Sequence, residues 1–179
     1  HKIYPYLLRK LAITRSNQVW ALDTTYIPMA RGFVYLTAVV DVASRKVLAH
    51  RVGITLEAIH AKEVIEQAFA KFGTPEIVNT DQGSQFTAEE FTSDVLEAGC
   101  KLSMDGRGAW RDNVFVERVW RSVKYERVYL HAYDSVSAAR TDIADYINWY
   151  NAQRPHSSLE RFTPDEKYFG ELPQLKLAA

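Results

Sequence analysis

The spacing of the apolar residues changes along this chain, and that change limits the fold more than any other feature of the sequence. Three runs rich in β-branched and aromatic residues, QVWALDTTYI, FVYLTAVVDV and KVLAHRVG, fall within residues 18–53. Such runs, separated by short turns, predict a three-stranded antiparallel meander. From residue 55 the segment TLEAIHAKEVIEQAFAKFG carries its apolar residues at helical spacing instead.

The rest of the chain alternates between the two patterns. The run EIVN predicts a fourth strand, Thr87 and Glu90 match a capping box that opens a second helix, and CKLSM predicts a fifth strand. Two further helical segments follow, NVFVERVWRSVKYERV and SVSAARTDIADYINWYNAQ. We therefore expect an α/β domain with a five-stranded mixed sheet, three antiparallel plus two parallel strands, flanked by helices. This order is one way of building a ribonuclease-H-like fold.

The length of 179 residues fits one such domain. We expect residues 1–17 to form an N-terminal arm or linker, residues 18–152 the ribonuclease-H-like core, and residues 153–179 a C-terminal tail. Because the first residue is His1 and not Met, we also expect further residues upstream.

The composition narrows the class of protein. The single Cys100 excludes an internal disulfide, so a reducing cytoplasmic compartment is the default expectation. The longest apolar run, FVYLTAVV, is far shorter than the ~20 residues that span a bilayer, and we expect no membrane segment. A formal net charge of zero argues mildly against nucleic acid as a partner. The average hides a segregated pattern, however, since residues 73–99 carry six acidic residues and no Lys or Arg.

Three carboxylates stand where this fold would bring them together. Asp23 lies within the first strand and Asp81 directly after the fourth, and these strands are neighbours in the predicted sheet. Glu117 lies on the helix that follows a glycine-containing loop, on a side adjoining the apolar face. A carboxylate within an apolar strand costs several kcal/mol to bury unless it is paired or binds a metal. For Asp81, capping of its own turn as an Asx motif is the alternative.

The ligand type points to a particular chemistry. Three oxygen ligands with no Cys or His among them suit Mg²⁺ or Mn²⁺ rather than zinc. Two such ions ~3.5–4 Å apart activate an attacking oxygen and stabilise the leaving oxygen of a phosphodiester. The residues Asp23, Asp81 and Glu117 therefore predict metal-dependent phosphodiester chemistry.

The spacing and the flanks of these residues carry a family resemblance. Asp23, Asp81 and Glu117, with 35 residues between the last two, resemble the DD(35)E signature of the retroviral-integrase and bacterial-transposase superfamily. The segments WALDTTYI, DVASR, NTDQGSQF, GRGAWRDNVFVERVWRSVKYE and YNAQRPHSSLERFTPDE resemble, in order and spacing, the catalytic protein of IS-three-type insertion-sequence transposases. The match runs from about Gln18 to Phe169, nearly the whole chain.

The resemblance implies a DDE-type transposase/integrase, a polynucleotidyl transferase that nicks transposon ends and joins the freed 3′-hydroxyl to another phosphodiester. By position, Asp23 would bridge two Mg²⁺ (or Mn²⁺) ions, Asp81 would hold one of them and Glu117 the other. The implied partners are DNA, as transposon ends and as target, further copies of the same chain in the active complex, and a small helix-turn-helix companion protein of the same element. The implied location is the bacterial cytoplasm, at the nucleoid.

Basic residues are the candidate DNA contacts. Arg121 and Lys124 match positions that contact DNA in the integrase relatives. Arg107 and Arg111, in the glycine-containing loop, are candidates for phosphate contacts, with a solvated basic surface as the alternative. Arg154, in RPHSSL, is expected either to contact DNA or to form structural hydrogen bonds.

Other residues have simpler interpretations. Trp110 is expected to stack on a displaced base or to anchor packing, and Asn113 to cap the helix that carries Glu117. Asp41 is expected to shape a turn or to pair with Arg45. The tryptophans expected in the core are Trp20, Trp120 and Trp149.

Two other functions are compatible with this sequence. One is a stand-alone ribonuclease-H-like nuclease, for which water would be the only nucleophile. The other is a catalytically silent, transposase-derived DNA-binding protein, and the presence of all three carboxylates argues against it.

Overall fold

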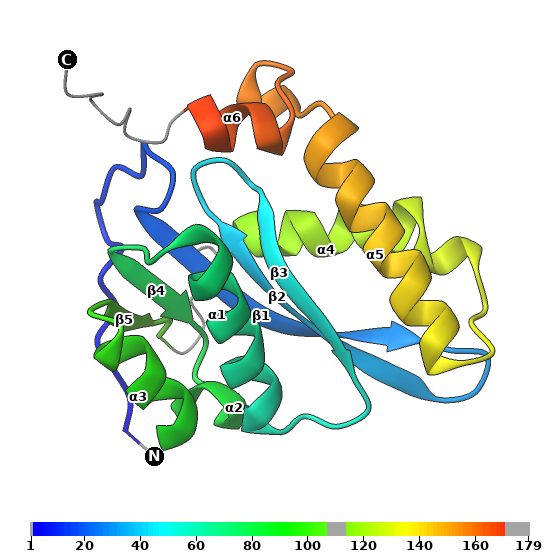
Figure 1. The fold of residues 1–179 in the computed structure, drawn as a ribbon, viewed down its shortest axis with the longest axis horizontal. Helices are drawn as coiled ribbons and strands as arrows, with labels where there is room; N and C mark the ends of the chain where they lie inside the picture. Colours follow the sequence, from blue (N-terminus) through cyan, green and yellow to red (C-terminus); the bar gives the residue numbers. More distant parts are fainter. Residues whose placement is uncertain (1, 107–113, 171–179) are drawn as a thin grey trace.

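The computed structural model describes residues 2–106 and 114–170, and it shows a five-stranded mixed sheet flanked by helices (Figure 1). The strands are β1 (Val19–Pro28), β2 (Phe33–Asp41), β3 (Val47–Gly53), β4 (Ile77–Thr80) and β5 (Lys101–Met104). Their order in the sheet is β3-β2-β1-β4-β5. Strand β2 pairs antiparallel with both β1 and β3, whereas β4 pairs parallel with β1 and β5. The predicted meander and the two parallel strands are confirmed.

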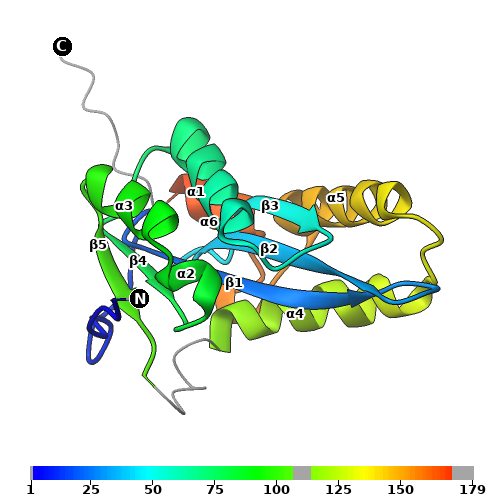
Figure 2. The same cartoon turned by 90° about the horizontal axis from the view of Figure 1, so that it is seen from below.

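The helices are distributed over both faces of this sheet. They are α1 (Ala58–Phe72), α2 (Ser84–Thr87), α3 (Glu89–Glu97), α4 (Val114–Glu126), η2 (Val128–Leu130), α5 (Val136–Gln153), η3 (Ser157–Leu159) and α6 (Pro164–Gly170). Figure 2 shows α1 and α3 on one side of the sheet and α4 on the other. Each side has its own apolar core: α1 and α3 contribute to one cluster of buried side chains, and α4 and α5 contribute to the second.

Strand β1 supplies both cores, because successive side chains of a strand point to opposite faces. Trp20 and Leu22 belong to the cluster with α1 and α3, whereas Val19 and Ala21 belong to the cluster with α4 and α5. By the same alternation, Asp23 falls on the face that α4 covers. The sheet therefore decides which helix this carboxylate meets.

The pairing of β1 with β4 decides its other neighbour. The last pair of this parallel ladder is Ala21 with Asn79. Two residues further along each chain come Asp23 and Asp81, on the same face as that pair. The prediction that β1 and β4 are neighbours is confirmed. Asp23 lies within β1, and Asp81 directly follows the last residue of β4, Thr80.

Two local expectations were wrong. Thr87 and Glu90 do not form a capping box: Thr87 closes the short α2, and α3 begins at Glu89 with Ala88 before it and no side-chain cap. Trp149 is not in the core, since 47% of its surface is exposed, although Trp20 and Trp120 are buried as expected.

The segments on either side of the core pack against it. In the arm, the Leu7 amide donates to Ser103 Oγ of β5 at 2.9 Å. In the C-terminal segment, Tyr168 of α6 is 1% exposed and its carbonyl accepts from Ser16 Oγ at 2.7 Å. The division into arm, core and tail stays a prediction. In the described part of the chain, every helix is too short or too polar to cross a membrane.

Candidate active site

Asp23 is a buried carboxylate that accepts a hydrogen bond from α4. It is 8% exposed, and its Oδ2 accepts a hydrogen bond from Trp120 Nε1 of α4 at 3.0 Å. Burial, together with the negative charges of Asp81 and Glu117, raises the pKa of Asp23 to about 7, against the lowering effect of hydrogen bonds from Trp120 and from the Thr24 backbone. Without a cation nearby, the surroundings of Asp23 therefore disfavour its ionised form.

Asp81 sits in the turn between β4 and α2. Its Oδ1 accepts from the Gly83 amide at 2.7 Å, which is the Asx motif considered from the sequence. A Cβ at residue 83 would lie 2.8 Å from Asp81 Oδ1 and 2.7 Å from Gln85 Oε1, so a larger residue there would require both side chains to shift. The turn role of Asp81 is confirmed, and its carboxylate is half-buried beside the site.

Below this turn, β4 and β5 are joined by side chains as well as by backbone. Asn79 Nδ2 donates to Asp105 Oδ1 at 2.9 Å, and Ser103 Oγ donates to Asn79 Oδ1 at 2.7 Å. All three side chains are buried. These hydrogen bonds fix the end of β4 from which the Asp81 turn starts.

Glu117 lies in the first turn of α4 and is exposed. Two contacts hold its helix against β1: the Trp120 hydrogen bond to Asp23, and Lys124 Nζ, which donates to Thr25 Oγ1 at 2.6 Å. Glu117 precedes Trp120 by three residues, so it lies one helical turn from the anchored position. Its charge contributes to the raised pKa of Asp23.

The charges of Asp81 and Glu117 both act on Asp23, and the three predicted ligands differ in their degree of burial. Within residues 2–106 and 114–170 there is no group of three or more His, Cys, Asp or Glu side chains placed to hold a metal ion. The donor set itself fits a hard divalent cation, because all three groups are carboxylates and the pKa of Asp23 is raised, first by burial and then by the negative charges of Asp81 and Glu117. A cation among them would relieve that repulsion.

The predicted DNA contacts lie in different settings. Lys124 is tied to Thr25 beside Asp23, while Arg121 is exposed, with its guanidinium 5.6 Å from the centre of the Tyr125 ring. Arg107 and Arg111 lie outside the described residues, as do Trp110 and Asn113.

Arg154 is already engaged within the protein. Its Nε and Nη2 donate to Glu126 Oε1 at 2.9 and 2.6 Å, and the Tyr146 hydroxyl donates to Glu126 Oε2. This pairing lowers the pKa of Glu126. The hydrogen-bonding alternative for Arg154 is thus present in the structure.

Asp41 shapes the turn between β2 and β3, as expected. Its Oδ2 accepts from the Ser44 hydroxyl at 2.6 Å and from the Ser44 amide at 3.1 Å, and its carbonyl accepts from the Arg45 amide at 2.8 Å. Arg45 adopts a left-handed backbone with φ of 67°. No ion pair between Asp41 and Arg45 is among those of the described residues.

Sequence reasoning missed two features of this region. Trp120 was expected only as a core residue, yet it is the hydrogen-bond partner of Asp23. Arg45 and Arg118 were given no part in a binding surface, yet both line one cavity. The position of Trp120 three residues after Glu117 could have signalled the first, and the DVASR motif, which ends in Arg45, could have signalled the second.

Comparison with known families agrees with this geometry. Residues 13–109 match the family described as Integrase core domain, and residues 98–164 match a second family of the same description. The chain belongs to the integrase core domain family. The resemblance to IS-three-type transposases is also confirmed by relatives of known name.

One such relative is the transposase for insertion sequence element IS904 of Lactococcus lactis subsp. lactis (strain IL1403), which is 33% identical over 160 residues, covering 87% of this chain and 63% of the relative. Another is the putative transposase InsK for insertion sequence element IS150 of Escherichia coli (strain K12). It is 28% identical over 162 residues, which cover 89% of this chain and 57% of the relative. The chain thus spans about three fifths of the length of these relatives.

Solved structures support the fold assignment. The HTLV-2 integrase catalytic core domain, in a dimeric form with magnesium, aligns with a TM-score of 0.70 at 19% identity over 88% of this chain and 99% of that one. The catalytic core domain of BIV integrase aligns with a TM-score of 0.67 at 21% identity, over 86% of this chain and 95% of that one. This integrase core has the ribonuclease-H-like fold that the order of its elements predicts.

Proposed function

We propose that this chain is the catalytic part of a DNA transposase, which nicks transposon ends and transfers the freed 3′-hydroxyl into another DNA. Membership of the integrase core family and the named transposase relatives support this proposal. The observation that carries it is Asp23: a buried carboxylate whose pKa is raised to about 7 by burial and by two acidic neighbours. A purely structural role gives no reason to keep an acid at that position.

In this proposal Asp23, Asp81 and Glu117 hold two Mg²⁺ or Mn²⁺ ions. When bound, such ions activate an attacking oxygen and stabilise the leaving oxygen of a phosphodiester. The chain itself supplies the positioning. Trp120 fixes the orientation of the Asp23 carboxylate by donating to Oδ2. The Gly83 amide orients the Asp81 carboxylate in the same way.

Glu117 completes the set from α4. Its exposed side chain needs to turn toward Asp23, while Trp120 and Lys124 keep the helix in place. Lys124 also places a positive charge beside Asp23, where the phosphates of a DNA strand would pass. The DNA contacts at Arg107, Arg111, Arg121 and Arg154 stay predictions of the same proposal.

The proposal includes partners. DNA would be bound both as transposon ends and as target, several copies of the chain would join two ends, and a helix-turn-helix companion would supply end recognition. The HTLV-2 integrase core was solved as a dimer, which is compatible with assembly in this fold. We propose the bacterial cytoplasm, at the nucleoid, as the place of action.

A crystal of this chain soaked in Mn²⁺ tests the metal site without relying on activity. We expect anomalous peaks beside Asp23 and Asp81, with Glu117 drawn toward them. The matched variant Glu117→Gln should lose at least one peak. If Mn²⁺ leaves these carboxylates unoccupied at millimolar concentration, the metal assignment is wrong.

Strand transfer tests the reaction. With Mg²⁺ and transposon ends that carry a pre-cut 3′-hydroxyl, wild type should join the ends to target DNA. The variants Asp23→Asn, Asp81→Asn and Glu117→Gln should lose activity by about 10³-fold, since metal contributes several kcal/mol to such a step. The exposed Asp134→Asn serves as the control. Degradation of the ends without joining would indicate a nuclease, and metal-independent binding alone would indicate a silent DNA-binding protein.

A further inference from the structure

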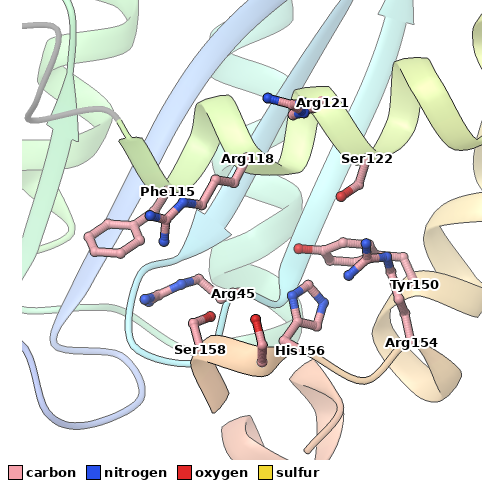
Figure 3. Close-up of a pocket in the computed structure, with 10 residues that line it drawn as sticks. Arg45, Phe115, Arg118, Arg121, Ser122, Tyr150, Arg154, His156 and Ser158 are labelled. Atoms are coloured by element: carbon pink, nitrogen blue, oxygen red, sulfur yellow. The ribbon is translucent and has the colours of Figure 1, made fainter. Parts of the chain in front are cut away.

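A basic cavity of about 460 Å³ lies beside α4 (Figure 3). The β2–β3 turn, α4, the end of α5 and the segment that follows α5 all contribute to its lining. Four of the lining residues are arginines, namely Arg45, Arg118, Arg121 and Arg154, and none of the described residues that line it is acidic. Asp23 lies outside this lining, so the cavity is separate from the proposed metal site.

The two sites use different flanks of one helix. At about 100° per residue, Trp120 and Lys124 point toward β1, whereas Phe115, Arg118 and Ser122 lie on the other flank. Figure 3 shows Arg118 and Ser122 reaching from α4 toward the cavity, and Arg121 on the outer side of the helix. A helix is ~10–12 Å wide with its side chains, so a DNA strand crossing α4 could reach both flanks.

Two of the cavity's arginines, Arg45 and Arg118, lie close to the same aromatic ring. The guanidinium carbons of Arg45 and Arg118 lie 3.7 and 5.9 Å from the centre of the Phe115 ring. Burial, and after it the positive charge of Arg118, lowers the pKa of Arg45 to about 10. Among the ion pairs of the described residues, Arg154 pairs with Glu126, and none involves Arg45, Arg118 or Arg121. The cavity thus brings like charges together without a neutralising acid in its lining.

Unsatisfied polar atoms point to the same place. Buried donors and acceptors almost always have a hydrogen-bond partner, so exceptions call for an explanation. Among the described residues, three buried side-chain atoms lack one, and two of them, Arg45 Nε and His156 Nε2, belong to residues that line this cavity. The third, on His50, belongs to a different pocket. Arg45 Nε always carries a proton, so it is a donor without an acceptor.

These features describe a site for an anion with several acceptor oxygens. Guanidinium groups match phosphate oxygens in a bidentate geometry, and hydrogen bonds between charged partners are shorter and stronger than neutral ones. Hydroxyl groups of Ser122 and Tyr150 face the same space (Figure 3). We propose that this cavity binds a phosphate group of a DNA backbone through Arg45, Arg118 and His156. The choice of DNA as the source of the phosphate depends on the proposed function; the anion site does not.

Binding of a fluorescent DNA duplex, followed by anisotropy in EDTA at a series of salt concentrations, tests this proposal. The main variant is Arg118→Gln, because Arg118 is exposed and its replacement leaves the core intact. Loss of one phosphate contact should reduce the slope of log K against log salt by about 0.9. Loss of a charge-assisted hydrogen bond should also weaken binding about tenfold at low salt. Arg118→Lys should keep most of the slope, since the charge stays.

Lys71→Gln is the matched control, because Lys71 is an exposed residue of α1 on the opposite side of the sheet. If Arg118→Gln binds DNA with the same affinity and slope as Lys71→Gln, the proposal is overturned. Inorganic phosphate, titrated while the Nε–H NMR signals of the arginines are observed, separates the two sources of the anion. A shift of the Arg45 signal by phosphate, together with unchanged DNA binding in Arg118→Gln, would assign the site to free phosphate and reject the DNA assignment.

The EDTA condition keeps this test apart from the proposed chemistry. If Arg118→Gln weakens DNA binding but wild type has no metal-dependent strand transfer, the cavity proposal stands and the proposed function fails. If wild type is active with Mg²⁺ while Arg118→Gln binds like Lys71→Gln, only the cavity proposal fails.

Discussion

Replacing Asp23 by Asn should make the metal-free protein more stable at pH 8, although it removes a residue central to the proposed function. In the folded chain the pKa of Asp23 is raised from 3.8 to about 7, first by burial and then by the charges of Asp81 and Glu117. Each unit corresponds to 1.36 kcal/mol, so ionising this side chain costs the folded state about 4 kcal/mol. An Asn at this position does not ionise, and its amide oxygen can still accept from Trp120 Nε1.

The sign of the pH dependence follows from proton binding. Between pH 3.8 and about 7 the folded protein holds a proton that the unfolded chain has released. The free energy of unfolding contributed by Asp23 is therefore complete below pH 3.8 and falls as the pH rises through this range. The advantage of Asp23→Asn should be absent near pH 4 and reach up to about 4 kcal/mol at pH 8.

Urea denaturation in EDTA, measured at half-unit steps from pH 4 to pH 8.5, gives this difference directly. Asp134→Asn is the matched control, because Asp134 is exposed and the same change there should leave the pH dependence as in wild type. Adding Mg²⁺ should stabilise wild type and not Asp23→Asn, since a ligand stabilises only the state that binds it. A variant that is less stable than wild type at pH 8, or a difference that does not vary with pH, would refute the electrostatic reasoning.

Three further results are expected. Trp120→Phe keeps an aromatic ring in the core but removes the indole N–H that donates to Asp23. It should destabilise the protein by about 1.5–3 kcal/mol at pH 8, where the carboxylate is charged, and should raise the pKa of Asp23 further; urea denaturation across the pH range measures both. Asn151→Ala removes two hydrogen bonds between α5 and the backbone of Val47, at 3.0 and 2.9 Å, and should lower the free energy of unfolding by about 2–3 kcal/mol. The control Gln153→Ala, at the exposed end of α5, should not show this loss. The pKa of His156 is lowered to about 4 by burial and by the charges of Arg154 and Arg45, so its NMR signals should not titrate between pH 5 and 8. The stability that its neutral form contributes should be lost as the pH drops from 6.5 to about 4. An NMR titration midpoint near 6.5 would contradict the buried position of His156.

The sheet could be predicted from the sequence because its strands are marked by composition as well as by period. The β-branched runs fixed the meander, and the helix between β3 and β4 required a crossover that makes β4 parallel to β1. That topology alone placed Asp23 beside the strand that Asp81 follows. Helix starts were harder. Thr87 matched a capping pattern, but it is 7% exposed inside α2, with its hydroxyl 3.4 Å from the Ser84 carbonyl, so it is not available to cap α3.

The side-chain contacts of the site were not predictable in the same way. The apolar period showed that Trp120 faces the core, but not that its Nε1 meets a carboxylate of β1. Arg45 and Arg118 come from a strand turn and from a helix that are distant in the sequence, and only packing around Phe115 brings them to one cavity. How far Glu117 reaches toward Asp23 depends on a rotamer, which neither spacing nor composition determines.

The alternation of β1 between two apolar cores also limits how this strand can change during evolution. Single substitutions alter one side chain at a time, but an inserted or deleted residue before Asp23 would turn it to the face covered by α1 and α3. There the carboxylate would replace an apolar side chain such as Leu22, far from Trp120 and Glu117. Homologues that share the proposed reaction should therefore differ in length at the turns of this sheet, and not within β1.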